Sequence, residues 1–184
     1  MNVKVKWITQ TGILLAMLVV VQLVTKSIGQ IVTGSLVNLI LAIATLVGGL
    51  TCGITLSVIS PIIAFILGIG PAFLPIVPCI CAGNAVLCLI LWHVSKKVRI
   101  NSKPLRSIIS IISIISASVC KFGVLYILVV LIVLPLLGLE EAKAAVISLS
   151  FSWTQLITAL IGSSIAVTIS PLILKGINNA SKSK

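Results

Sequence analysis

Long apolar runs, separated by short polar or glycine- and proline-rich breaks, dominate the pattern along this chain. A helix needs about 20 apolar residues to cross the hydrocarbon core of a bilayer, with a usual range of about 17–25. Six runs meet or approach that length, and we predict a transmembrane helix for each: residues 7–25, 31–49, 51–69, 79–94, 107–137 and 144–174. The pattern therefore predicts an all-α membrane protein in which residues 1–184 form a single transmembrane domain.

The runs differ in length and regularity. Pro61 lies in the middle of the third run, where proline removes a backbone hydrogen bond and predicts a kink. Residues 70–78 contain four glycines and prolines and predict a loop, which leaves a short fourth helix. The fifth and sixth runs hold about 30 residues each, or roughly 45 Å of helix, so we expect them to tilt, bend or project from the membrane.

Lysine and arginine set the orientation that we predict for the six spans. Ten basic residues fall on one side: Lys4, Lys6, Lys96, Lys97, Arg99, Lys103, Arg106, Lys175, Lys182 and Lys184. The other side receives Lys26 and Lys143, together with the acidic pair Glu140 and Glu141. Because cytoplasmic loops carry an excess of Lys and Arg, we place both termini and the basic loop at 95–106 in the cytoplasm.

The narrowest break between two runs is the stretch from Gly48 to Cys52. If the second and third runs formed one long helix, the number of spans would change and the basic segments would lie on opposite sides of the membrane. The positive-inside rule disfavours that arrangement. We therefore predict two helices with a break between them.

Composition excludes a soluble domain. The chain is 59% hydrophobic and 8% charged, and a folded domain with so little polar surface needs lipid around it. The net charge of +11 does not indicate nucleic-acid binding, because the basic residues lie between apolar runs rather than on one soluble face. The apolar run from Ile8 to Val24 lacks a small-residue cleavage site, so we interpret it as a retained first helix. We predict a multi-pass protein of the bacterial cytoplasmic membrane.

The sequence carries no recognisable catalytic or metal-binding motif. The five cysteines lie in or beside apolar runs and are interpreted as packing residues. Cys79 and Cys81 form a CxC that no further ligands complete into a zinc pattern. The sequence lacks a G-x-x-x-x-G-K-[ST] phosphate loop, and His93 beside Trp92 fits an interfacial anchor. We expect no enzyme activity, cofactor or bound metal.

Lys121 is the main candidate for a functional residue. It lies near the centre of the fifth run, where a charged side chain costs at least about 2.5 kcal/mol and usually faces the protein interior or a water-filled cavity. The alternative is a lysine that snorkels to the surface or loses its charge by desolvation. No acidic residue lies in the runs, so an anionic or carbonyl-bearing ligand would supply its partner.

Other polar and aromatic residues in the runs are candidates for the same site. Asn84, Gln155, Asn38 and Gln22 lie within apolar runs, where each either contacts a ligand or joins two helices by a hydrogen bond. Trp153 and Tyr126 either line a pocket or pack against other helices. The candidate substrate-binding set is thus Lys121, Asn84, Gln155, Trp153, Tyr126 and Asn38.

Small residues in the first run form a candidate docking face. Gly12 and Ala16 are four residues apart, a spacing that lets another helix approach closely. Gly49 and Gly53 repeat the pattern. Each pair either packs within the chain or receives a partner subunit.

The chain resembles the substrate-binding S component of an energy-coupling factor (ECF) transporter. Three segments carry the resemblance: PIVPCICAGNAVLCLILW with its Gly-Asn pair, SVCKFGVLYILV with its Lys-Phe pair, and SFSWTQLITALIGSSIA with its Gln. Ser163 stands where the third segment would be expected to carry a second glycine. The chain also resembles this family because it has six predicted helices in a short sequence and no nucleotide-binding site.

The resemblance implies a function and partners. Such a protein binds a vitamin or similar micronutrient from outside, in a pocket near the outer face, and associates with a transmembrane T subunit and two ATPases. It is thought to topple in the membrane to release its ligand inward. Gly12 and Ala16 match the face that docks on the T subunit, although the family often has alanine at both positions. Residues 26–34 would form the loop that covers the pocket.

Two other classes of protein remain open at this point. A self-sufficient small secondary transporter or channel would usually show inverted repeats and paired broken helices, and no convincing repeat stands out. A membrane enzyme would need clustered acids, histidines or serines within the membrane. The identity of the substrate is left undefined by the sequence.

Overall fold

The computed structural model describes residues 3–69, 73–97 and 103–182, and all regular secondary structure in these ranges is helical. The prediction of an all-α protein is confirmed. The elements are α1 (Val3–Thr25), α2 (Gln30–Gly48), α3 (Leu50–Ile66), α4 (Ile76–Lys97), α5 (Lys103–Leu125), the π-helix η1 (Tyr126–Val133), α6 (Leu134–Leu137), α7 (Glu141–Ser150) and α8 (Trp153–Lys182).

Much of the described chain suits the interior of a bilayer. Five helical stretches are long and apolar enough to cross a membrane: Lys4–Thr25, Gln30–Gly48, Ile76–Lys96, Ser107–Leu137 and Glu141–Ile177. Helix α3 is apolar but shorter, with 17 residues. Many large apolar side chains are exposed on the outer faces of these helices, as lipid contact requires. The fold is compatible with a multi-pass membrane protein.

The second and third runs are separate helices, as predicted. Helix α2 ends at Gly48 and α3 begins at Leu50, and Gly49 between them has a φ of +92°. Glycine tolerates this left-handed region because it has no Cβ atom. One residue is therefore enough to reverse the chain between the two helices, and α3 then continues through Pro61.

Two boundaries around the fourth run differ from the prediction. Helix α4 begins at Ile76 and has 22 residues, so the predicted loop at 70–78 is wrong over its last three residues and the fourth helix is not short. Pro78 lies in the first turn of α4, where backbone N–H groups have no partner within the helix. Proline there does not interrupt the helix. Residues 70–72 of the predicted loop lie outside the described residues.

The last two runs also differ from simple long helices. The fifth passes from α5 through η1 into α6 without a turn, and the π-helix ends just before Pro135. The sixth run, which we expected to tilt, bend or project, is interrupted: α7 ends at Ser150 and α8 starts at Trp153. Phe151 caps α7 with a φ of −106° and a ψ of 10°, which is outside the helical region. The break leaves the last carbonyls of α7 free to accept other donors.

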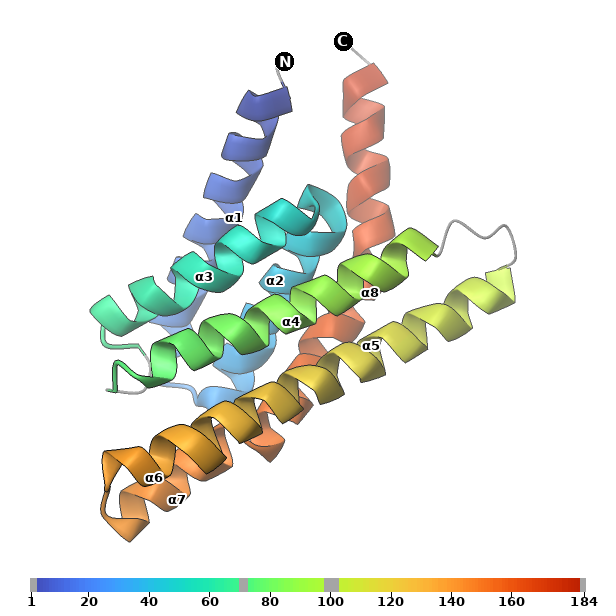
Figure 1. Ribbon diagram of the computed structural model, residues 1–184. Coiled ribbons are helices and arrows are strands. Elements are labelled where there is room, and N and C mark those ends of the chain that lie inside the picture. The colour runs from blue at the N-terminus through green and yellow to red at the C-terminus, as the bar shows by residue number, and fades with distance from the viewer. Residues whose placement is uncertain (1–2, 70–72, 98–102, 183–184) are drawn as a thin grey trace.

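Helix α2 occupies the centre of the bundle (Figure 1) and packs against α1, α3, α4 and α8, while α5 packs against α4 and α8. Figure 1 shows both chain ends at the top and the end of α4 and start of α5 at the right. The end of α3, the start of α4 and the α6–α7 turn lie toward the lower left. Successive long helices therefore alternate in direction, which brings the two termini to the same end of the bundle.

Candidate functional site

A cavity of about 670 Å³ lies in the half of the bundle opposite the chain ends. It is bounded by the end of α1, the start of α2, the second half of α3, the first half of α4, the last turns of α5 and the α7–α8 corner. Its volume falls within the ~300–1,000 Å³ that is usual for small-molecule sites. The polar and charged side chains that line it are Gln22, Lys26, Ser27, Gln30, Thr33, Asn38, Ser60, Asn84, Lys121, Ser150 and Gln155.

Lys121 of α5 lies at the buried end of this cavity. Its ammonium donates to Asn38 Oδ1 of α2 at 2.5 Å and to Asn84 Oδ1 of α4 at 2.7 Å. Asn38 Nδ2 in turn donates to Thr158 Oγ1 of α8 at 3.2 Å. All four residues are almost fully buried. One hydrogen-bonded network thus connects four helices at the floor of the cavity.

No carboxylate balances this ammonium. The chain has two acidic residues, and both lie at the start of α7, where Glu140 pairs with Lys143 at 3.8 Å on the exposed surface. A lysine ammonium has three N–H donors, and the described residues accept from Lys121 at two places. One donor is therefore left for a ligand or for water.

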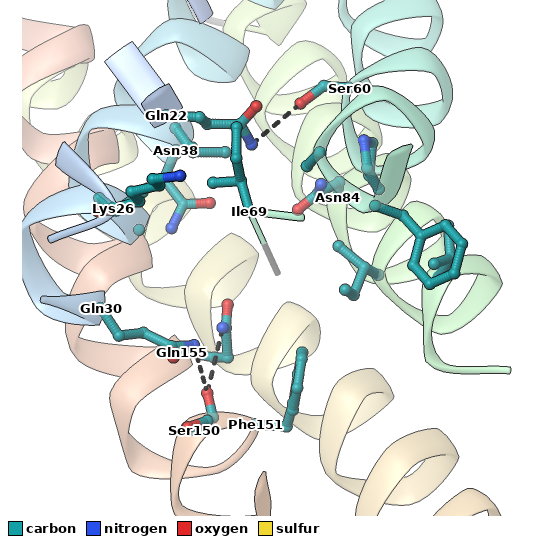
Figure 2. Close-up of a pocket in the computed structure, with 18 of the residues that line it drawn as sticks. Gln22, Lys26, Gln30, Asn38, Ser60, Ile69, Asn84, Ser150, Phe151 and Gln155 are labelled. Atoms are coloured by element: carbon teal, nitrogen blue, oxygen red, sulfur yellow. Dashed lines mark hydrogen bonds between the residues drawn. The ribbon is translucent and has the colours of Figure 1, made fainter. Parts of the chain in front are cut away.

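Gln22 contributes a second unsatisfied group. Its Nε2 atom donates to Ser60 Oγ of α3 at 3.5 Å, drawn in Figure 2, while its Oε1 atom is buried without a partner among the described residues. A buried acceptor without a donor costs about 1–3 kcal/mol. A ligand or water that donates to this oxygen would remove that cost.

A pair of hydrogen bonds closes one side of the cavity near its mouth. Gln30 Nε2 of α2 and Gln155 Nε2 of α8 both donate to the carbonyl oxygen of Ser150, at 3.3 and 3.2 Å (Figure 2). Ser150 ends α7, so its carbonyl is one of those released by the break between α7 and α8. The break that the sequence did not predict therefore supplies an acceptor that joins α2 to α8.

The structure brings together four of the six predicted substrate-binding residues. Lys121, Asn84, Asn38 and Gln155 all line the cavity. Because α4 starts at Ile76, Asn84 lies about 12 Å inside the helix and reaches the depth of Lys121. Asn84 therefore lies deeper within α4 than a helix starting at residue 79 would place it.

The other two predicted residues lie elsewhere. Tyr126 and Trp153 are not among the residues that line the cavity. Both rings stack on Phe122, with centroid distances of 5.8 and 5.6 Å. Trp153 is 64% exposed, so this aromatic cluster faces the surroundings of the bundle.

The small-residue face of α1 is open. Gly12 and Ala16 are both exposed, and a Cβ atom added at Gly12 would meet no described atom within 4 Å. Gly53 differs, because an added Cβ would collide with Thr45 and approach Cys88 Sγ at 3.3 Å. The Gly53 position is used for packing inside the chain, whereas the Gly12 position is free for another helix.

Sequence reasoning missed part of the cavity lining, most notably Lys26, Gln30, Ser60 and Ser150. Lys26 could have been found from the sequence, because it begins the segment that the family resemblance placed over the pocket. Ser60 and Ser150 had none, because serines are common in apolar helices and bond their own backbone. Comparisons with protein-family models, curated proteins and solved structures gave no match for this chain.

Proposed function

We propose that this protein is the substrate-binding S component of an ECF-type transporter in the bacterial cytoplasmic membrane. Six spans place both termini in the cytoplasm, and the cavity takes up a vitamin-like micronutrient from outside. A transmembrane T subunit and two ATPases provide the energy, since the chain has no phosphate loop of its own. The observation that carries the proposal is the buried Lys121 ammonium at the cavity floor, held by two asparagines with a donor to spare.

The location of the cavity supports uptake from outside. Its exposed lining residues include Lys26 and Gln30, and the end of α1 and the start of α2 that carry them lie in the same half of the bundle as the α6–α7 turn (Figure 1). The distribution of basic residues assigns this half to the outer side of the membrane. An S component receives its ligand from that side.

The open face of α1 supports dependence on a partner. Gly12 and Ala16 are exposed and would let a helix of the T subunit approach the α1 backbone closely.

Ligand binding tests the proposal at Lys121. We expect the gently purified protein to retain a small molecule that mass spectrometry can identify. Lys121→Met should bind that molecule at least about tenfold more weakly, since a buried charged hydrogen bond contributes about 1.5–3 kcal/mol. The change leaves Asn38 Oδ1 and Asn84 Oδ1 without their donor and should cost about 1–3 kcal/mol of stability, so affinity is compared under conditions in which circular dichroism shows that the variant is folded. Unchanged affinity in the folded variant would remove Lys121 from the site.

Co-purification tests the partners. The tagged protein should carry a T subunit and two ATPases out of membranes that contain them. Gly12→Leu should lose these subunits but keep ligand affinity, because the added side chain projects from an open face of α1. Gly176→Leu makes the same change at an exposed position of α8, where an added Cβ also meets no described atom within 4 Å, and serves as the matched control. Substrate movement by the protein alone in liposomes would instead identify a secondary transporter.

A further inference from the structure

The hydrogen-bonding groups that remain free at the cavity floor are N–H donors. Asn38 and Asn84 use their Oδ1 atoms to accept from Lys121. Lys121 keeps one free N–H, and Asn84 Nδ2 makes no hydrogen bond to any described residue. These two donors are adjacent, since Lys121 Nζ lies 2.7 Å from Asn84 Oδ1. A pair of neighbouring donors, one of them charged, matches the two oxygens of a carboxylate or another oxyanion.

A second ammonium lines the same cavity closer to its mouth. Lys26 follows the last turn of α1, and Figure 2 shows its side chain among the lining residues. Among the described residues it has no carboxylate partner. On α2, Gln30 at the mouth and Asn38 at the floor are separated by about 12 Å of helix. The two lysines therefore stand at different levels of one cavity that no acidic side chain lines.

Gln22 adds an acceptor between these levels. It lies one helical turn before Lys26, whose backbone N–H donates to the Gln22 carbonyl at 3.1 Å. Its buried Oε1 atom lacks a donor. A ligand with an N–H or O–H group at this height would satisfy it.

On the basis of the function proposed above, we infer that the substrate is an acid with two anionic groups. Lys121 and Asn84 hold one group at the floor, Lys26 pairs with the other near the mouth, and Gln22 accepts from an N–H or O–H between them. Complementary charge at both ends makes the cavity selective against neutral and cationic molecules of the same size.

A series of saturated α,ω-dicarboxylates of four to nine carbons, each with its monomethyl ester, tests this assignment by thermal shift of the purified protein. At the best chain length, the diacid should bind about threefold more tightly than its ester, as a solvent-accessible ion pair allows. Lys26→Gln should abolish this ratio and leave binding of the ester unchanged. Lys121→Met should weaken binding of the diacid and of the ester about tenfold or more. Lys143→Gln removes a lysine outside the cavity and should change neither the affinity for the diacid nor the affinity for the ester.

A separate measurement tests whether Gln22 accepts a hydrogen bond from the ligand. A hydroxyl moved along the best diacid should, at one position, tighten binding about fivefold in the wild-type protein and not in Gln22→Met. The two-anion assignment is overturned if no diacid stabilises the wild-type protein, or if diacids and esters stabilise it equally. Failure of the wild-type protein to carry a T subunit out of membranes that contain one, with diacid binding intact, would instead overturn the proposed function and leave the ligand assignment standing.

Discussion

At the scale of single residues, one buried lysine without a carboxylate partner organises the floor of the site. Lys121 is 2% exposed, and its ammonium depends on the amide oxygens of Asn38 and Asn84. Amide oxygens satisfy the donors of an ammonium but do not cancel its charge. A ligand that brings a negative charge is therefore bound by a group already held in place, which lowers the cost of ordering on binding.

Replacing an amide of the network by a carboxylate tests this account. Asn84→Asp keeps the shape of the side chain and supplies the missing negative charge within the protein. We expect an equal or higher melting temperature and about tenfold weaker binding of the retained acidic ligand. Asn84→Leu is the companion variant, which leaves the ammonium with one acceptor fewer and should destabilise the protein by about 1–3 kcal/mol. Binding by Asn84→Asp at wild-type strength would contradict the charge argument.

At the scale of helices, close approach decides where these residues meet. Helices α2 and α8 pack at Gly162, where an added Cβ atom would lie 2.5 Å from the Ser35 carbonyl oxygen and 2.7 Å from Asn38 Cβ. The absence of a side chain at Gly162 lets Thr158 of the same helix reach Asn38. The helix packing and the polar network therefore share one contact.

Gly162→Ala should disturb both the packing of α2 on α8 and the hydrogen bond between Asn38 and Thr158. The added methyl group has backbone on one side and Asn38 on the other, so α8 must move outward at a cost of about 1–3 kcal/mol. We expect a lower melting temperature together with weaker ligand binding. Gly12→Ala makes the same chemical change on an open face and should leave both measurements unchanged. Equal behaviour of the two variants would show that α2 and α8 are not closely packed.

At the scale of the whole molecule, alternating helix directions and basic residues lead to the same topology. The described helices run back and forth between two ends of the bundle, with both termini at one end (Figure 1). The end of α4 and the start of α5, which flank the predicted cytoplasmic loop, lie away from the α6–α7 turn (Figure 1). With the orientation that we propose from the basic residues, a ligand site in the opposite half is accessible from outside.

Cysteine labelling in intact cells checks this topology. Lys143→Cys near the α6–α7 turn should react with a membrane-impermeant maleimide added outside. Ser95→Cys at the end of α4 should react only after the membrane is permeabilised. Both positions are exposed, and the unmodified chain measures the background of its native cysteines. Labelling of Ser95→Cys from outside would overturn the predicted orientation.

The amino-acid sequence by itself determined the all-α class, the approximate positions of the long apolar helices and the break at Gly49. These features depend on local composition, since apolar length, glycine and proline act within one or two turns of the chain. It also singled out Lys121, because a charge among apolar residues is conspicuous without any knowledge of the fold.

Only the tertiary structure decided which residues meet Lys121 and where the cavity lies. Asn38 and Asn84 are 83 and 37 residues away in sequence, and their convergence depends on how α2, α4 and α5 pack. The break at Phe151 and the position of Lys26 in the cavity wall are likewise tertiary outcomes, as is the exclusion of Trp153 and Tyr126 from it. The physical reason is that these helices carry apolar residues on every face. The hydrophobic pattern alone therefore does not show which face is buried in the protein.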